Sequence, residues 1–277
     1  MDAWLRFRKN RLALIGLALV LMLVLAATLA PWLALHDPTR QSLIEKRARP
    51  GAKYLLGADE FGRDILSRVI YGSRVALLVG VVSVLIALAG GLVLGTAAGF
   101  TGGWLDTVVM RVVEILLAFP YLLLALAIVA MLGPGVLNTT LAVGIWGVPA
   151  VTRMVRGSVL ALRETEYVGA ARALGAPAPV VLRRHVLPNV LPGLVVYATL
   201  FMANAILLEA ALSFLGLGVQ PPTASWGLMV STGRDVLLVA PHVATVPGLA
   251  IMVAVLGFNL VGDGLRDALD PRLTTTR

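Results

Sequence analysis

Long stretches without charged residues dominate the pattern of polar and hydrophobic positions along this chain. Five of them contain no Asp, Glu, Lys or Arg, and they span 12–35, 75–105, 115–152, 186–208 and 236–262. An α-helix needs ~20 mostly apolar residues to cross the ~30 Å hydrocarbon core of a bilayer. Each stretch meets that length, so the pattern predicts transmembrane helices.

The stretch 115–152 is too long for one span. It is interrupted by Gly133-Pro134-Gly135, a strong turn signal, and we therefore divide it in two. The sequence then predicts an all-α integral membrane protein with six transmembrane helices. Their expected ranges are 12–35, 76–100, 110–132, 137–157, 190–212 and 241–263.

The first span has an alternative interpretation as a signal peptide. Basic residues precede it, and Ala26-Ala27-Thr28-Leu29-Ala30 weakly resembles a cleavage site. The apolar run is longer than the ~7–15 residues of a signal-peptide core, and Pro31 lies just after the candidate cut. We therefore expect a retained anchor.

Composition supports the membrane assignment and removes several classes of site. The chain is 58% hydrophobic and 14% charged, with a mean hydropathy of +0.90, whereas soluble domains are ~45–50% apolar and ~25% charged. It has no cysteine, which excludes disulfides and thiolate metal sites, and its three histidines lie far apart in sequence. We expect no metal site and no cofactor bound by this chain.

Motifs of nucleotide binding and hydrolysis are also missing from the sequence. The only lysines are Lys9, Lys46 and Lys53, and none lies in a phosphate-binding loop. Neither a Gly-x-Ser-x-Gly nor a His-Glu-x-x-His string occurs. We therefore expect no enzyme activity in this chain, and any nucleotide that drives it must bind another chain.

The distribution of basic residues predicts the orientation. Net charge is +8, and an excess of Lys and Arg in short loops is typical of cytoplasmic loops. Those loops favour N- and C-termini inside, with 158–189 inside and 36–74 outside, although 36–74 itself carries eight basic residues. The basic excess thus reflects membrane topology, and we expect no nucleic-acid partner. The expected organisation is 1–35, 36–74, 75–264 and a tail at 265–277.

The loop 158–189 predicts one short helix. Thr165 is a candidate N-cap, Glu166 lies in the first turn, and Gly175 is suited to the stop after Leu174. Four apolar positions recur at three- and four-residue steps: Tyr167, Ala170, Ala171 and Leu174. A helix this short is not stable alone, so this face must lie on lipid headgroups or in a groove of a partner.

Four further features suggest roles outside the loop 158–189, and the first three lie near the outer end. Glu209 is a carboxylate in an apolar span, so it either marks a pathway or gate or makes an interhelical hydrogen bond. A non-helical cap is expected to contain Gln220, Pro221, Pro222 and Trp226, with Trp226 at the membrane interface.

The charged run 59–68 is expected as a solvated surface helix. Ala87, Gly91, Gly95 and Gly99 form a stripe of small residues for helix packing, preferably within this chain.

The loop 158–189 resembles the EAA loop of ABC importer permeases. Five residues match that pattern at its spacing: Ala170, Ala171, Gly175, Leu187 and Pro188. Gly169 stands where the family has Glu, and His185 where it has Ile. The resemblance implies that the loop, including Glu166, Tyr167 and Leu174, couples the chain to an ATPase subunit.

Three more segments resemble signatures of the C-type permease of dipeptide and oligopeptide ABC importers. They are LGADEFGRDILSRVIYGSRVAL at 56–77, LEAALSFLGLGVQPPTASWG at 208–227 and FNLVGDGLRDALDPRL at 258–273. The resemblance implies a type I ABC importer transmembrane domain in a bacterial or archaeal cytoplasmic membrane. Dipeptides or oligopeptides are its expected substrates.

The implied partners are a B-type permease, two ATPase subunits that bind ATP and Mg²⁺, and an extracytoplasmic solute-binding protein. That protein would dock on the cap of Gln220, Pro221, Pro222 and Trp226. Nickel chelates or glutathione are alternative substrates within the same family. A secondary transporter is the rival class, and it would show inverted repeats and ionisable groups at the midplane, neither of which is clear here.

Overall fold

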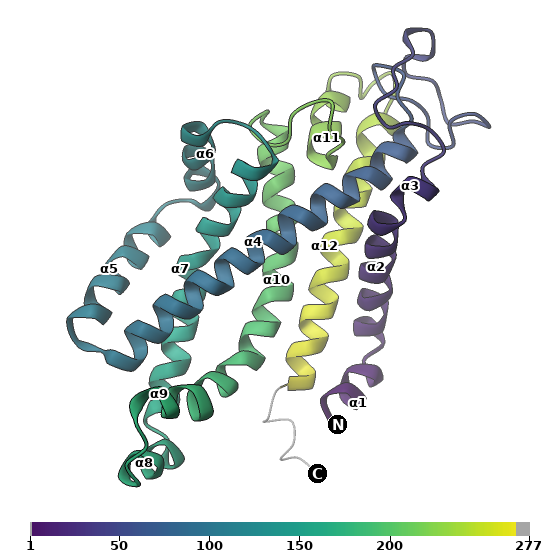
Figure 1. The fold of residues 1–277 in the computed structure, drawn as a ribbon. Helices are drawn as coiled ribbons and strands as arrows, with labels where there is room; N and C mark the ends of the chain where they lie inside the picture. The colour runs from purple at the N-terminus through teal and green to yellow at the C-terminus, as the bar shows by residue number, and fades with distance from the viewer. Residues whose placement is uncertain (1, 270–277) are drawn as a thin grey trace.

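The computed structural model describes residues 2–269, and the regular elements within that range are helices (Figure 1). They are α1 (Asp2–Lys9), α2 (Arg11–Thr28), α3 (Ala30–Leu33), α4 (Ile65–Thr101), α5 (Gly103–Ala118), α6 (Tyr121–Leu132), α7 (Val136–Arg163), α8 (Glu166–Ala173), α9 (Ala178–Val181), α10 (Leu187–Phe214), α11 (Trp226–Arg234) and α12 (His242–Leu269). A 3₁₀ turn covers Leu43–Glu45, and a π-helical turn, η2, covers Leu182–Val186. The prediction of an all-α protein is confirmed.

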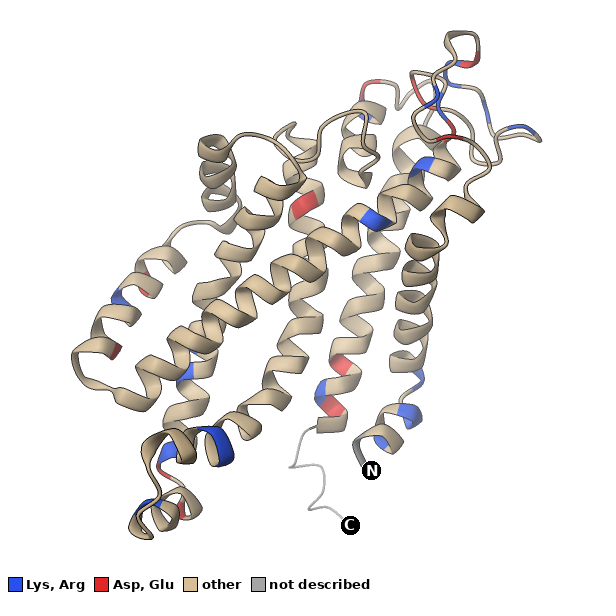
Figure 2. Ribbon diagram, viewed as in Figure 1, with Lys and Arg blue, Asp and Glu red and all other residues tan. Residues whose placement is uncertain are grey.

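The long helices connect two ends of the molecule. At one end, which we call the α8 end, lie α1, α8, α9 and the last turn of α12 (Figure 1). At the other, the loop end, lie the segment 34–64, α11 and the connection 215–225 (Figure 1). Charged residues lie mostly toward these two ends, and the middle of the bundle is nearly free of them (Figure 2).

Four helical stretches are long and apolar enough to cross a membrane: Arg11–Thr28, Ile65–Thr101, Ala178–Phe214 and His242–Leu269. α7 has 28 residues but is less apolar, and it packs along α4. These five correspond to predicted spans, although the first ends at Thr28, with α3 following, and α4 begins well before residue 76.

The predicted span 110–132 is not one straight helix. It is divided into α5 and α6, which are bent by 97°. Pro120 explains the break, because proline has no N–H to donate and it disfavours helical geometry at the preceding residue. Phe119 accordingly adopts an extended backbone, with φ −80° and ψ 137°.

Small residues allow α4 and α7 to pack closely. A Cβ atom added at Gly95 would lie 2.6 Å from the Thr152 carbonyl oxygen, and one added at Gly99 would lie 3.0 Å from the Arg156 carbonyl oxygen. Ser83 also donates a 2.9 Å hydrogen bond to the carbonyl of Thr140 on α7. The stripe therefore packs within this chain, as predicted.

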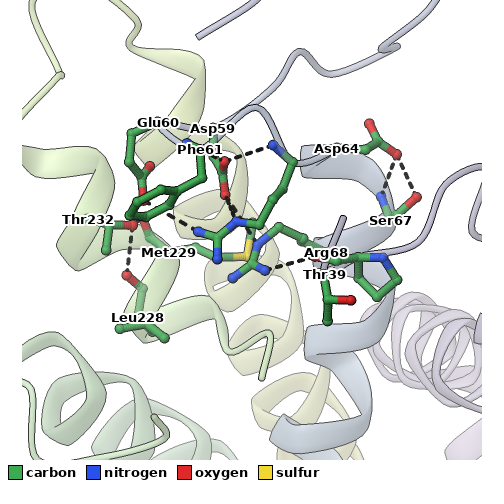
Figure 3. A network of polar contacts seen from close by, with 12 residues as sticks. Thr39, Asp59, Glu60, Phe61, Asp64, Ser67, Arg68, Leu228, Met229 and Thr232 are labelled. Carbon is green, nitrogen blue, oxygen red and sulfur yellow. Dashed lines mark hydrogen bonds and ion pairs between the residues drawn. The ribbon is translucent and has the colours of Figure 1, made fainter. Parts of the chain in front are cut away.

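The charged run 59–68 is buried, so the prediction of a solvated surface helix is wrong. Asp59, Arg63 and Arg68 are each less than 10% exposed. Arg63 Nε lies 2.6 Å and Arg68 Nε 3.5 Å from Asp59 Oδ2, and Arg68 also donates to the Pro38 carbonyl at 2.9 Å (Figure 3). Buried charges need such partners, because an unpaired ion loses its hydration without compensation.

This ion-pair cluster stands directly before α4 and connects the segment 34–64 to it. Asp64 is the N-cap of α4 and accepts a 3.0 Å hydrogen bond from the backbone N–H of Ser67. A second link reaches α12, where His242 Nε2 lies 3.1 Å from the Ala48 carbonyl oxygen. The loop end is therefore held against α4 and α12 by specific polar contacts.

The α4–α7 contact generates the first testable prediction. Gly95→Leu places a side chain where α7 backbone lies, and overpacking of this kind costs ~1–3 kcal/mol or more. We expect a lower thermal midpoint of the purified protein in detergent and less folded material. Gly248→Leu on α12 is the matched control, because an added Cβ there meets no atom within 4 Å. Equal midpoints for the two variants would contradict the close packing.

Candidate functional site

The short helix predicted in the loop 158–189 is present as α8, at Glu166–Ala173. The helix ends as expected, because Gly175 adopts a left-handed backbone conformation with φ +83°. The N–H of Gly175 donates to the Arg172 carbonyl at 2.9 Å, and the N–H of Ala176 donates to the Ala171 carbonyl at 3.1 Å. This is a complete Schellman motif, and it reverses the chain after one short helix.

Thr165 occupies the N-cap position of α8, but its side chain does not cap the helix. Its hydroxyl instead donates a 2.6 Å hydrogen bond to the Leu162 carbonyl in the last turn of α7. The predicted side-chain cap is therefore wrong. Thr165 connects α8 to the preceding helix, which fixes the angle at which the chain enters the loop.

The predicted apolar face of α8 is divided between two sides. Val168 is fully buried, and Ala171 is half-buried against the core of this chain. Tyr167, Ala170 and Leu174 are exposed, and Leu174 is 90% exposed. Grouping Ala171 with the exposed residues was therefore wrong. The pattern overlooked Val168, which supplies the inward contact together with Ala171.

The exposed side of α8 is apolar, and its glycines leave the backbone open to contact. A Cβ atom added at Gly169 or Gly175 would meet no atom within 4 Å, so a partner can approach the backbone there. Glu166 and Arg172 are exposed beside it. Exposed apolar patches rimmed by polar residues mark interaction sites. We call the exposed residues Glu166, Tyr167, Ala170, Leu174 and Gly175 the α8 surface.

The loop is also connected to the long helices. The guanidinium of Arg172 lies 5.6 Å from the ring centre of Phe100 in the last turn of α4. The ring of Tyr167 lies 6.3 Å from that of His185 in η2, which continues directly into α10. At the start of α10, Leu187 is half-buried and Pro188 is exposed. These contacts connect α8 to the last turn of α4 and, through η2, to the start of α10.

Glu209 lies in a buried polar network toward the loop end. It is 2% exposed, and its Oε1 atom accepts hydrogen bonds from the hydroxyls of Ser213 and Ser225, each at 2.8 Å. The N–H of Val219 in turn donates to the Ser213 hydroxyl oxygen at 3.0 Å. The network joins α10 to the connection 215–225 and to the N-terminus of α11.

The cap at 215–225 is non-helical, as predicted, and exposes Gln220, Pro221 and Pro222. Gln220 donates its side-chain N–H groups to the carbonyls of Gly216 and Gly218, at 3.0 and 3.1 Å. These bonds fold the cap onto itself and leave its proline pair at the surface.

Trp226 is buried inside the protein, so the prediction that its side chain faces the membrane interface is wrong. It is 3% exposed, and its indole N–H donates a 2.9 Å hydrogen bond to the Val69 carbonyl on α4. Its ring occupies the space where Gly72 has no side chain. Composition alone does not separate an interfacial tryptophan from a buried one. Trp226 fastens α11 to α4 and is removed from the candidate docking surface.

The segment 34–64 encloses a polar cavity of about 460 Å³ at the loop end. On its wall, hydrogen bonds from Lys53 and Tyr54 hold the pKa of Glu45 below its usual range. The same contact raises the pKa of Tyr54 to about 12. His36 Nδ1 lies 3.4 Å from Asp64 Oδ2 across the same cavity. No group of three or more His, Asp or Glu suited to a metal ion occurs among residues 2–269.

Comparison with solved structures supports the fold. The chain matches a structure described as an inward-facing conformation of the MetNI methionine ABC transporter, with a TM-score of 0.61. The match covers 73% of this chain and 97% of the other, at 21% sequence identity. It shows that the two share the helical architecture of an ABC transporter transmembrane domain.

Comparison with curated proteins extends along nearly the whole chain. A di/tripeptide transport permease of Pseudomonas aeruginosa is 47% identical, covering 98% of this chain and 92% of the relative. A dipeptide transport permease of Alkalihalophilus pseudofirmus is 44% identical, covering 98% and 90%. A glutathione transport permease of Escherichia coli O157:H7 is 43% identical with the same coverage.

Family models match two parts of the sequence. The model for the N-terminal transmembrane domain of oligopeptide transport permease C matches residues 1–50. The model for the binding-protein-dependent transport system inner membrane component matches residues 91–275. With the near full-length relatives, these matches show that the chain belongs to the family of binding-protein-dependent transport system inner membrane components, the permease subunits of ABC importers.

Proposed function

We propose that this chain imports dipeptides or other short peptides as one permease subunit of an ATP-driven complex. The observation that carries this proposal is 47% identity to a di/tripeptide permease over 98% of the chain. Glutathione, itself a short peptide, is the second candidate, because glutathione permeases are 43% identical over the same length. Family membership leaves the secondary-transporter alternative without support.

In this proposal the α8 surface is the docking site for an ATPase subunit. ATP and Mg²⁺ bind the two ATPase subunits, and their closure moves α8. The contacts of α8 with Phe100 on α4 and, through His185, with α10 carry that motion into the bundle. The helices then change between inward- and outward-open arrangements as rigid bodies. The second, B-type permease completes the passage.

The proposed orientation places the α8 end in the cytoplasm. α1, α8 and the end of α12 lie at this same end, so one assignment places all three (Figure 1). Basic residues of the N-terminal segment, Arg6, Arg8, Lys9 and Arg11, favour the cytoplasmic side. The loop end, with its exposed Gln220-Pro221-Pro222 cap, then faces the extracytoplasmic binding protein. The membrane is the bacterial cytoplasmic membrane.

Orientation is tested with single cysteines, because the chain has none of its own. Ala52 and Ala178 are both exposed, at the loop end and the α8 end respectively. In intact cells, Ala52→Cys is expected to react with a membrane-impermeant thiol reagent and Ala178→Cys only after the cells are opened. The opposite labelling pattern would invert the topology and exclude α8 as a cytoplasmic docking site.

Docking is tested at Leu174, whose side chain is the most exposed apolar group on the α8 surface. Leu174→Glu should leave membrane abundance unchanged, because the residue contacts little of its own chain. It should lower peptide uptake and co-purification of the ATPase subunits at least ~10-fold, as expected for a central interface residue. Ala171→Glu is less informative, because Ala171 packs against this chain.

The matched control is Leu238→Glu, which changes an equally exposed leucine at the loop end. It should preserve ATPase binding. If Leu174→Glu assembles and transports as the unmodified protein does, α8 is not the docking element.

Glu209 is proposed as an anchor of the cap with no substrate contact. Glu209→Gln keeps an oxygen acceptor for Ser213 and Ser225, so near-normal uptake is expected. Glu209→Leu leaves both hydroxyls without that acceptor, which costs ~1–3 kcal/mol and should lower the thermal midpoint. Uptake of free-amine and N-acetylated peptides should change equally in Glu209→Gln. A selective loss of the free-amine peptides would instead indicate direct contact with the substrate ammonium.

A further inference from the structure

One side of α10 is only partly covered by the rest of the chain. The other sides of this helix pack against α4, α7, α11 and α12. The residues on the partly covered side recur every three or four positions and are exposed or half-buried. We call them the α10 strip: Gly193, Val196, Tyr197, Leu200, Asn204, Leu207 and Ala211.

The α10 strip differs in chemistry from the other exposed helix faces. In the middle of α2 and α12 the exposed side chains are aliphatic or Met, as expected next to lipid, and charged or polar ones are exposed only toward the helix ends. The strip instead exposes a polar side chain, Asn204, in mid-helix, with half-buried Tyr197 two turns before it. The side-chain N–H of Asn204 donates to the Leu200 carbonyl one turn earlier, at 3.0 Å, and among residues 2–269 it is not bonded to another helix. Polar groups at this depth usually face a water-filled pathway or the bundle interior.

A cavity of about 200 Å³ opens on the outer half of this strip. Its walls come from α6, α7 and α10, and they are formed by Tyr121, Trp146, Asn204, Leu207, Leu208 and Ala211. We call it the outer cavity. Asn204 is the polar member among the four α10 residues of the wall, and the other three are aliphatic.

Stacked aromatic rings form the base of the outer cavity. The ring of Trp146 lies 5.6 Å from that of Tyr121 and 5.4 Å from that of Phe201. Phe201 is buried and stacks in turn on Tyr197, at 5.8 Å. Phe201 thus packs against Trp146, which itself lines the cavity. Tyr197 lines a second cavity, of about 340 Å³, on the half of the strip nearer the α8 end.

The size and walls of the outer cavity indicate what it can hold. Pockets that enclose whole drug-sized ligands measure ~300–1,000 Å³, so a cavity of about 200 Å³ accommodates part of a larger molecule. Aromatic faces and aliphatic side chains favour an apolar or aromatic group. The Asn204 amide, at the side of the same cavity, suits the backbone of a peptide.

We propose that the outer cavity is a subsite for one apolar or aromatic side chain of the transported peptide, reached through a water-filled passage along the α10 strip. This inference rests on the proposed function, because it assumes that peptides move through the complex. A side chain of the second permease or a lipid tail would be the other occupants of such a cavity, and the experiments below distinguish them.

The first experiment measures access in the assembled importer. Asn204→Cys, in the otherwise cysteine-free chain, should react with a small water-soluble maleimide in membranes. A dipeptide that contains Leu or Phe should slow this labelling at least ~5-fold, and Gly-Gly should slow it less, because burial of an apolar side chain stabilises the bound state. Leu256→Cys, on the exposed apolar face of α12, is the control and should remain unlabelled.

Two results of this experiment would overturn the inference. Absence of labelling at position 204 would mean that lipid or the second permease covers the strip. Labelling that no peptide slows would mean that the passage has no subsite at this position. Labelling does not require turnover, so neither result depends on the success of a transport assay.

The second experiment fills the cavity. Ala211→Phe occupies its space and should lower uptake of Phe- or Leu-containing dipeptides ~10-fold relative to Gly-Gly, which is the low end of discrimination by an apolar pocket. Ala250→Phe is the matched control, because Ala250 lines an apolar groove between α2, α4 and α12. An equal loss for all dipeptides in Ala211→Phe would reject the subsite. If the unmodified complex moves no peptide, the proposed function itself fails.

Discussion

The close contact between α4 and α7 is the constraint on which the rest of the structure depends. At Gly95 and Gly99 the backbone of α4 lies against both the backbone of α7 and the side chains of Val155 and Val159. α4 has 37 residues and extends from the ion-pair cluster at the loop end to Phe100 near α8. Because α7 is held against it, both ends of α4 keep a defined position relative to the loop 158–189.

Buried polar groups hold the elements of the loop end in place beside the α4–α7 pair. Asp59 pairs with Arg63 and Arg68 just before α4, and Glu209 holds the cap through Ser213 and Ser225. Each group gives up hydration and regains a hydrogen bond or an ion pair within the protein. These arrangements tolerate little change, since removal of one partner leaves the other buried without compensation. These contacts therefore fix the segment 34–64 and the cap to the helices at the loop end.

Much of the fold is accessible from the sequence, because the hydrocarbon core of the bilayer imposes a length and a polarity that hydropathy records directly. The α8 helix and its Gly175 stop follow from local capping rules, and Schellman geometry confirms them. The break at Pro120 was also visible in principle, since proline disfavours helix at the preceding residue. It was overlooked because the apolar run continues through it.

The errors concern residues whose environment is decided by tertiary contacts. Arg68 and Trp226 belong to types common at membrane surfaces, yet both are buried and donate hydrogen bonds to backbone carbonyls distant in sequence. Val168 was overlooked because an eight-residue helix gives too few positions to separate an inner from an outer face. In each case the deciding neighbour lies on another element, and local pattern carries no information about it.

The modest apolarity of α7 has a consequence for biogenesis. Four helical stretches are long and apolar enough to cross a membrane, whereas α7, which carries Pro149, Thr139 and Thr140, is not among them. Thr139 and Thr140 are buried in the finished bundle. Because α4 precedes α7 in the chain, its glycine stripe offers α7 a protein surface in place of lipid.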